Sequence, residues 1–406
     1  MSSSAGPSNE AYAAKYPLHH SNPTSPSYYY CYSPPPSSVY PLTPAGSKVL
    51  LRVSGDDFTA YDQLVVVASS LFFVGGVFWV PAVYAWLVNR YRRIPSHETK
   101  RRAIYASLLL TVTAMLVAGP HRRAEFGRRI NVRRWRLWKS WMRFFAMEVV
   151  ADRFDTNNNN NTNSSVRDGL GNNNEPAILG ISPHGIFPFG LAFAALTEAS
   201  AEVFGPFRAV VATATQLLPW VRDVLRWVRA VDASRPSVER SLQQRDRIGL
   251  APGGIAEISQ TPSETKEFAI VRKGIFRLAY KYKVPIVPIY CFGSSMLLKR
   301  WNIPWLERLG VLLRISLVVF YGKWGLPIPF RQRLLYVMGN PIYPPTNNQP
   351  SGATTNGLGV DTDDASSKCV NDMYERYCNE LRRIFDRHKE SYAKGWEKKS
   401  LVILTE

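Results

Sequence analysis

His184 has the sequence setting of a general base at the end of a strand. It follows the apolar run 177–181 through Ser182, and beyond Gly185 the small-residue segment 191–201 can form a helix. This pattern predicts a strand, a turn and a helix, and open α/β sheets place their chemistry at the carboxyl ends of strands. A neutral imidazole with a pKa near ~6.5 is the usual general base at cellular pH. The alternative is a histidine that only ends a strand.

Further blocks follow His184 in a fixed order. Segment 182–190 reads Ser-Pro-His-Gly-Ile-Phe-Pro-Phe-Gly, segment 251–257 reads Ala-Pro-Gly-Gly-Ile-Ala-Glu, and segment 272–279 reads Arg-Lys-Gly-Ile-Phe-Arg-Leu-Ala. These blocks resemble the signatures of the type 2 acyl-CoA:diacylglycerol acyltransferase family, which acylates diacylglycerol, monoacylglycerol or wax alcohols. The similarity covers about residues 120–346. The chain has Ser182 and Ser294 where the family usually has a histidine and a glutamate.

The resemblance implies an α/β layer like that of the phospholipid acyltransferases. It also implies transfer of an acyl group from acyl-CoA to a lipid alcohol, with acyl-CoA as co-substrate and neither a cofactor nor a metal. Such a transfer needs a base for the hydroxyl proton, donors for the developing oxyanion and exclusion of water. We expect His184 to be the base, and Pro183 and Gly185 beside it to bind substrate.

Glu257 is the expected partner of the imidazole. The related phospholipid acyltransferases carry an aspartate five residues after the histidine, where this chain has Phe189. We therefore expect Glu257 to supply the carboxylate that fixes the tautomer of the ring. Gly253 and Gly254 form a turn whose backbone N–H groups can approach a substrate closely. The alternative is a glutamate that the helix dipole favours at a helix N-terminus.

The acceptor and the coenzyme A site follow from charges in these blocks. The phospholipid acyltransferases have charged residues that meet a phosphate in the block where this chain reads Gly-Gly-Ile-Ala, so diacylglycerol fits better than a phosphorylated acceptor. Arg272 and Lys273 are expected to bind the phosphates of coenzyme A. The alternative is a solvated helix terminus.

Charge and cysteine content limit the kind of partner and the cellular compartment that the chain fits. The chain has 406 residues, 46% hydrophobic residues and a net charge of +19. Between Arg90 and Arg143 the only acidic residues are Glu98 and Glu125, and apolar runs adjoin this basic stretch. This arrangement favours anionic lipid over nucleic acid, for which no motif is present. The four cysteines have neither disulfide-framework nor metal-ligand spacing, which indicates a reducing compartment.

The N-terminal part is expected to enter a membrane. Residues 1–60 are rich in Ser, Pro and Tyr and predict a disordered tail. Segment 64–88 has no charged residue and as a helix would measure about 37 Å, with a kink at Pro81. With the apolar segment 104–119 it predicts a membrane hairpin over 61–120, either complete or with a re-entrant second arm. The alternative is two buried core helices.

The remaining elements complete the predicted architecture. In segment 128–145, Trp135, Trp138 and Trp141 share one helical face among basic residues, which predicts a helix in the membrane plane or, alternatively, one packed on the domain. Alternating strand and helix patterns predict a largely parallel sheet within an acyltransferase domain over 121–346. An asparagine-rich insertion (155–174), a linker (347–368) and a packing helix within 369–406 complete the chain.

The sequence thus predicts an acyl-CoA-dependent O-acyltransferase that forms triacylglycerol. Its expected partners are acyl-CoA, diacylglycerol and membrane lipids. The sequence leaves open whether the chain forms a homo-oligomer. The expected location is the endoplasmic reticulum membrane or the lipid droplet, with the catalytic domain in the cytosol. The alternatives are a monoacylglycerol or long-chain alcohol acyltransferase, and a non-catalytic hairpin that anchors on lipid droplets.

Overall fold

A computed structural model describes four stretches of the chain. These are residues 43–117, 130–152, 175–345 without 214, 216, 217, 261, 302, 304 and 307–317, and 362–405. The expected asparagine-rich insertion, most of the expected linker and residues 1–42 of the expected tail lie outside the described residues.

An eight-stranded sheet forms the centre of the molecule. Its strands in spatial order are β1 (Lys48–Arg52), β2 (Glu148–Ala151), β11 (Leu335–Met338), β8 (Ile286–Phe292), β3 (Ile178–Ser182), β6 (Ile248–Leu250), β4 (Arg208–Val211) and β5 (Val231–Asp232). From β8 to β5 all pairs are parallel, as the alternating pattern predicts, whereas β11 pairs antiparallel with β8, and β1 antiparallel with β2. The expected disorder up to residue 60 is therefore wrong for β1.

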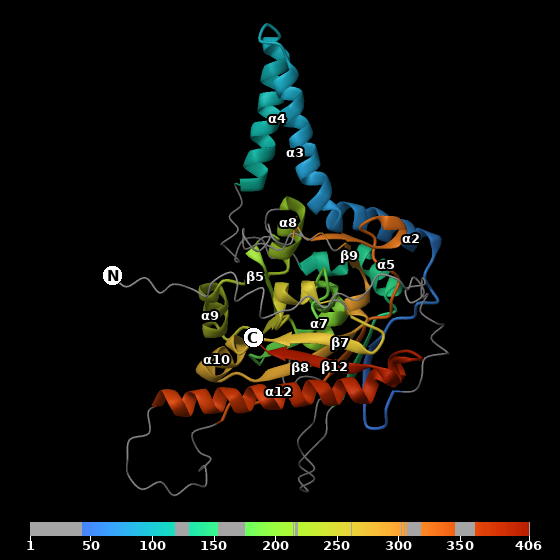
Figure 1. Cartoon of the computed structure of the whole chain (residues 1–406), viewed down its shortest axis with the longest axis vertical. Coiled ribbons are helices and arrows are strands. Elements are labelled where there is room, and N and C mark those ends of the chain that lie inside the picture. Colours follow the sequence, from blue (N-terminus) through green and yellow to red (C-terminus); the bar gives the residue numbers. More distant parts are fainter. Residues whose placement is uncertain are drawn as a thin grey trace, which may run out of the picture.

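Helices cover both faces of this sheet (Figure 1). One face carries α9 (Arg235–Gln243), α10 (Gly274–Tyr282) and α12 (Thr362–Tyr392), and the other carries α5 (Arg136–Phe144), α6 (Phe189–Leu196), α7 (Glu198–Phe204) and α8 (Pro219–Trp227). Neighbouring residues of a strand, such as Val149 and Val150, belong to the two opposite cores because strand side chains alternate between faces. The result is a three-layer α/β/α arrangement.

The C-terminal region packs as predicted but holds an extra strand. The apolar stripe of α12, which includes Met373, Tyr377 and Leu381, is fully buried against the sheet. The helix begins at Thr362, inside the expected linker, and ends at Tyr392. After the turn η9 (Trp396–Lys398), β12 (Ser400–Thr405) pairs in parallel with β7 (Lys266–Val271). The expected helix over 369–406 is thus corrected to a helix followed by a strand.

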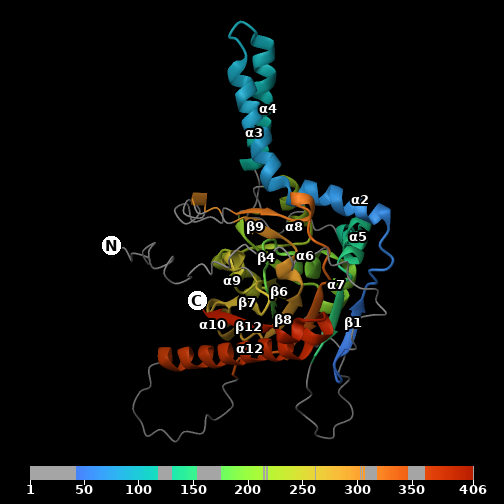
Figure 2. The ribbon, with the colours of Figure 1, turned by 45° about the vertical axis from the view of Figure 1, so that its right-hand side comes forward.

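The apolar segment 64–88 does not form one straight helix. Helix α2 (Ala60–Ser69) and the π-helical turn η3 (Ser70–Val74) lie along the domain against α5, and α3 (Gly76–Arg93) then rises beside α4 (Thr99–Val117) as a projecting hairpin (Figures 1 and 2). Within the described residues no single helix has the length and apolar composition to cross a bilayer. The two parts Ala60–Val74 and Gly76–Arg93 meet that test together, with a bend of 58° between them.

The bend lies at Gly75 rather than at the expected kink, Pro81, which stays inside α3. A Cβ on Gly75 would lie 3.2 Å from Cγ of Pro327, so the glycine allows close approach of the domain. Upstream of the bend, polar residues hold α2 to α5: Ser140 donates to Asp62 at 2.6 Å, and the indole N–H of Trp141 donates to Ser69 at 2.9 Å.

The tryptophan-rich segment packs inside the domain. In α5, Trp138 and Trp141 are 6% and 4% exposed, and only Trp135, just before the helix, is exposed. The prediction of a membrane-plane helix over 128–145 is therefore wrong, and the packed alternative holds. Its physical reason is that α2 covers α5 and contributes hydrogen-bond partners to it.

Gly180, in the strand that leads to His184, yields a test of the fold. A Cβ on Gly180 would overlap the hydroxyl of Tyr377 on α12, which donates to the Gly180 carbonyl at 3.2 Å. Overpacking of this kind costs about 1–3 kcal/mol. We expect Gly180→Ala to lower the thermal unfolding midpoint in detergent, and Tyr377→Phe to restore part of the loss when combined with it. An unchanged midpoint in Gly180→Ala would show that α12 does not clamp β3 in this way.

Candidate active site

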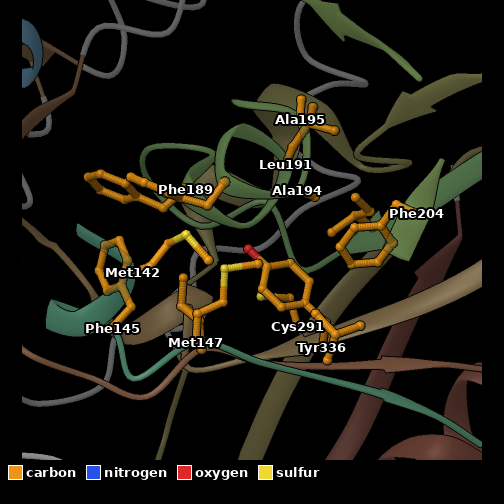
Figure 3. Packing of buried hydrophobic residues seen from close by; sticks show 14 of the residues in the cluster. Met142, Phe145, Met147, Phe189, Leu191, Ala194, Ala195, Phe204, Cys291 and Tyr336 are labelled. Atoms are coloured by element: carbon orange, nitrogen blue, oxygen red, sulfur yellow. The ribbon is translucent and has the colours of Figure 1, made fainter. Parts of the chain in front are cut away.

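His184 lies in the turn between β3 and α6, and both ends of this turn are fixed. On one side β3 pairs with β6 and β8 in the middle of the sheet. On the other side the hydroxyl of Tyr336 donates to the Gly190 carbonyl in α6 at 2.9 Å. Figure 3 shows the apolar cluster in which Phe189 and Leu191 of this helix pack with Cys291 and Tyr336. The imidazole is therefore carried by a rigid support.

The ring of His184 is held by its own loop. Its Nδ1 lies 2.7 Å from the carbonyl oxygen of Gly185. Since a carbonyl only accepts hydrogen bonds, Nδ1 carries the proton in this contact and Nε2 keeps its lone pair. Burial lowers the pKa of His184, although the contact with Gly185 acts in the opposite direction. The ring is therefore neutral near pH 7 and able to accept a proton at Nε2.

Gly185 can occupy this position because it lacks a side chain. Its φ is +69°, which strains other residues, and a Cβ would lie 2.6 Å from the backbone oxygen of Ser294. The turn that presents His184 thus packs directly against η7 (Ser294–Met296), the segment after β8.

The carboxylate of Glu257 connects His184 to a neighbouring strand. Glu257 lies in the 3-10 helix η6 (Gly254–Ser259), and its Oε2 accepts a short hydrogen bond from the backbone N–H of His184. Its Oε1 accepts from the N–H of Ile270 in β7 at 2.7 Å. Both hydrogen bonds are with the main chain, so the expectation that Glu257 fixes the tautomer of the ring is corrected. That contact comes from the Gly185 carbonyl instead.

The environment of Glu257 is apolar enough to change its charge. Burial raises the pKa of Glu257 to about 7, against the two backbone hydrogen bonds and the nearby charge of Arg272, which lower it. Gly253 allows this burial, because a Cβ there would lie 2.5 Å from Cγ of Glu257. Of the two glycines that were expected to form a turn close to the substrate, Gly253 therefore packs on the carboxylate of Glu257.

A cavity of about 130 Å³ adjoins these residues. Its lining includes Pro183, Gly185 and Glu257, which the sequence analysis selected, and Glu267, Lys299, Arg300 and Tyr321, which it missed. Lys299 and Arg300 belong to β9 (Lys299–Trp301), which pairs with β10 (Val319–Tyr321). The basic pair interrupts an apolar stretch of sequence, and this signal could have identified it. Burial lowers the pKa of Lys299.

The other predicted residues lie at the edge of this site or away from it. Lys273 donates to the side chain of Asn371 at 2.8 Å and lies over the ring of Tyr374, so its ammonium group contacts α12. Arg272 acts on Glu257 through its charge. Gly254 has a φ of +53° and faces open space. The binding of coenzyme A phosphates by Arg272 and Lys273 stays a prediction.

Two further observations concern the serines at positions where the family usually has a histidine and a glutamate, and the groups that could bind a metal ion. Ser182 and Ser294 are buried; the side chain of Ser182 interacts with that of Tyr377, whereas the hydroxyl of Ser294 has no hydrogen-bond partner among the described residues. In the same part of the chain, no three His, Cys, Asp or Glu side chains are grouped so that they could hold a metal ion.

Comparison with known proteins assigns the family. The family model described as diacylglycerol acyltransferase matches residues 101–403. The chain is 27% identical to acyl-CoA wax alcohol acyltransferase 2 of Mus musculus, over 68% of this chain and 80% of that protein. It is 25% identical to diacylglycerol O-acyltransferase 2 of Homo sapiens, over 66% of each. The crystal structure of a 1-acyl-sn-glycerophosphate acyltransferase from Thermotoga maritima aligns with 79% of this chain and 97% of its own, with 13% identity and a TM-score of 0.32.

The family match spans most of the chain and includes His184, Glu257 and the residues around the cavity. The match begins in α4 and ends in β12. The chain belongs to the diacylglycerol acyltransferase family.

Proposed function

We propose that this acyltransferase uses acyl-CoA to acylate the free hydroxyl of diacylglycerol and forms triacylglycerol, with His184 as general base. The observation that carries the proposal is the neutral imidazole at the end of β3, held at Nδ1 in a turn whose residues Pro183 and Gly185 line a cavity. A base with a pKa close to the working pH accelerates such a proton transfer most effectively.

The reaction needs one proton to move twice. Nε2 of His184 takes the proton of the acceptor hydroxyl while the oxygen attacks the thioester carbonyl. When the tetrahedral intermediate collapses, the carbon–sulfur bond breaks and the imidazolium gives the proton to the departing thiolate of coenzyme A. Glu257 acts as a positioning residue, because its carboxylate holds the backbone of His184 and does not need to change protonation during the transfer.

The substrate assignments have separate support. Lys299 and Arg300 bring two basic side chains to the cavity, where the carboxylate of Glu267 is paired with Lys399, and this basic pair favours the anionic coenzyme A over a neutral donor. The uncharged block before Glu257 favours an acceptor without a phosphate, and the human relative is named for diacylglycerol. The mouse relative is named for wax alcohol. Long-chain alcohols and monoacylglycerol therefore remain the alternative acceptors.

We further propose that the α3–α4 hairpin enters the endoplasmic reticulum membrane and leaves the α/β domain in the cytosol. Apolar side chains on the outside of the hairpin support this placement: Val77, Val83, Trp86, Ile104, Leu108, Leu110 and Met115 are exposed. Exposed apolar surface of this extent on a projecting element is typical of membrane contact. The same apolar side chains would also contact the surface of a lipid droplet. The non-catalytic alternative is a hairpin that only anchors the protein there.

Loss of the imidazole tests the catalytic proposal. We expect His184→Ala in membranes to lower acyl transfer from labelled acyl-CoA by about 10²–10⁴-fold, because the hydroxyl proton loses its acceptor. Diacylglycerol, monoacylglycerol and a fatty alcohol are offered in parallel to identify the acceptor. His97→Ala, at an exposed histidine, is the matched control and keeps wild-type activity. Equal activity of the two variants would show that His184 is not the base, and the absence of product from the well-expressed wild-type protein with all three acceptors would favour the anchoring role.

The pH profile tests the charge assignment. Glu257 is ionised above a pKa of about 7, and burial holds the pKa of His184 below its ordinary value of 6.5. As the pH falls, Glu257 is protonated first, and kcat/KM for acyl-CoA decreases below about pH 7. In Glu257→Gln this ionisation is absent, and the remaining decrease should begin below pH 6.5, where His184 gains a proton. A decrease near pH 7 that persists in the variant would assign it to another group.

Glu257→Gln also tests the positioning role at constant pH. The amide oxygen can accept one of the two backbone N–H groups, and the amide nitrogen cannot accept the other. Leaving one buried donor unsatisfied costs about 1–3 kcal/mol, so we expect kcat to fall by about 5–160-fold while KM for acyl-CoA changes little. Measured kcat and KM at pH 8 would contradict this role if kcat stayed at the wild-type value.

A further inference from the structure

Helix α2 buries two polar residues beside Val66 and exposes an apolar stripe. Asp62 and Ser69 face α5 and are 2% and 9% exposed, whereas Leu64 is 66% exposed. The exposed apolar residues of this helix and of η3 recur at helical spacing and form one stripe: Tyr61, Leu64, Leu71 and Phe72. A surface helix of a water-soluble protein places its apolar stripe inside and its polar side outside. The outward stripe of α2 therefore needs a partner other than water.

The buried polar residues of α2 fix which side faces outward. Asp62 accepts from Ser140 at 2.6 Å and pairs with Arg143 at 3.3 Å, and Ser69 accepts from Trp141. These contacts would break if the helix rotated to bury its apolar stripe. The stripe is thus held away from the domain by satisfied hydrogen bonds.

A second exposed apolar group lies at the base of α3. It consists of Trp301 on β9, Trp305, Trp324 in the turn η8 (Lys323–Gly325) and Leu326. The ring centre of Phe320 in β10 lies 5.0 Å from that of Phe78 in α3, and a Cβ on Gly75 would lie 3.2 Å from Cγ of Pro327. Figures 1 and 2 both show β9 and α2 on the side of the domain from which the α3–α4 hairpin projects.

These residues have the composition of a bilayer interface. Tryptophan is enriched at the level of lipid headgroups, and basic residues beside it meet phosphates. Here the ammonium group of Lys323 lies 4.6 Å from the ring centre of Trp324. The group at the base of α3 also adjoins the hairpin through the contact between Phe320 and Phe78, and the hairpin itself exposes apolar side chains.

We propose that the stripe of α2 and the four residues at the base of α3, here named the interfacial face, lie in the headgroup region of a phospholipid bilayer. The inference rests on the proposed membrane insertion of the hairpin and adds a second, in-plane contact that the hairpin alone does not require. An apolar helix face buried at this depth gains stability from the apolar area removed from water.

The contact has a consequence for the lipid substrate. Strand β9 contributes Lys299 and Arg300 to the cavity, and its next residue, Trp301, belongs to the interfacial face. The partner strand β10 contributes Tyr321 to the cavity and Phe320 to the contact with α3. One two-stranded element thus separates the cavity from the bilayer, which gives a lipid acceptor a short path from the leaflet.

Site-directed spin labelling of the full chain tests the interfacial face. A nitroxide is attached in the variants Leu64→Cys and Trp324→Cys, with Arg376→Cys on the outer side of α12 as control. The background replaces the native cysteines Cys31, Cys291, Cys369 and Cys378. The protein is reconstituted in vesicles of phosphatidylcholine and phosphatidylserine, and collision rates are measured with oxygen and with a water-soluble nickel complex.

We expect the labels at positions 64 and 324 to collide more often with oxygen than with nickel, and the label at 376 to show the reverse. Nickel collisions at 64 and 324 as frequent as at 376 would place the face in water. Protection from both reagents would indicate a second copy of the chain or another protein. Either result overturns the inference.

Acyl transfer by the unlabelled protein, measured in the same vesicles, separates this inference from the proposed function. Activity on diacylglycerol together with water-exposed labels would overturn the interfacial face alone. Lipid-exposed labels on a protein that acylates none of the three acceptors would overturn the proposed function alone.

Discussion

The site depends on a single buried carboxylate that accepts hydrogen bonds from two main-chain segments. Glu257 holds the backbone of His184 with one oxygen and that of Ile270 in β7 with the other. It therefore joins the turn after β3 to a strand outside the central sheet. An unpaired buried N–H costs about 1–3 kcal/mol, so this arrangement restricts the turn to one conformation. Since the ring of His184 is in turn fixed by the Gly185 carbonyl, the direction of Nε2 follows from the backbone.

Contacts also connect the site to the side of the domain from which the α3–α4 hairpin projects. The turn of His184 packs on η7, and the chain continues from there into β9, which lines the cavity and carries Trp301. Strand β10 returns along the cavity and contacts the base of α3. The turn of His184 and the projecting hairpin are thus connected through η7 and the β9–β10 pair. If the hairpin enters a bilayer as proposed, this connection places the site of the α/β domain close to the lipid.

The hydropathy pattern predicted the elements that bury an apolar face. It failed where hydrogen bonds to distant residues determine which side of a helix is buried. The predicted alternation of strands and helices corresponds to the parallel strands from β8 to β5, and the predicted packing helix corresponds to α12 with its buried apolar face. His184 and Glu257 lie together as expected. The carboxylate, however, contacts the backbone N–H of His184 and not its imidazole. Hydropathy could not reveal that Asp62 and Ser69 turn the polar side of α2 inward, because those bonds depend on Ser140 and Trp141 far along the chain. For the same reason it could not predict that the tryptophans of α5 are buried.

The central claim is that Nε2 of His184 faces the acceptor hydroxyl. The most direct test is a structure of the full chain with diacylglycerol and a thioether analogue of acyl-CoA, which cannot transfer its chain. We expect the acceptor oxygen within about 2.6–3.2 Å of Nε2, with Glu257 still hydrogen-bonded to the backbone of His184. An acceptor oxygen bonded to a different side chain, with the imidazole turned away from it, would contradict the account.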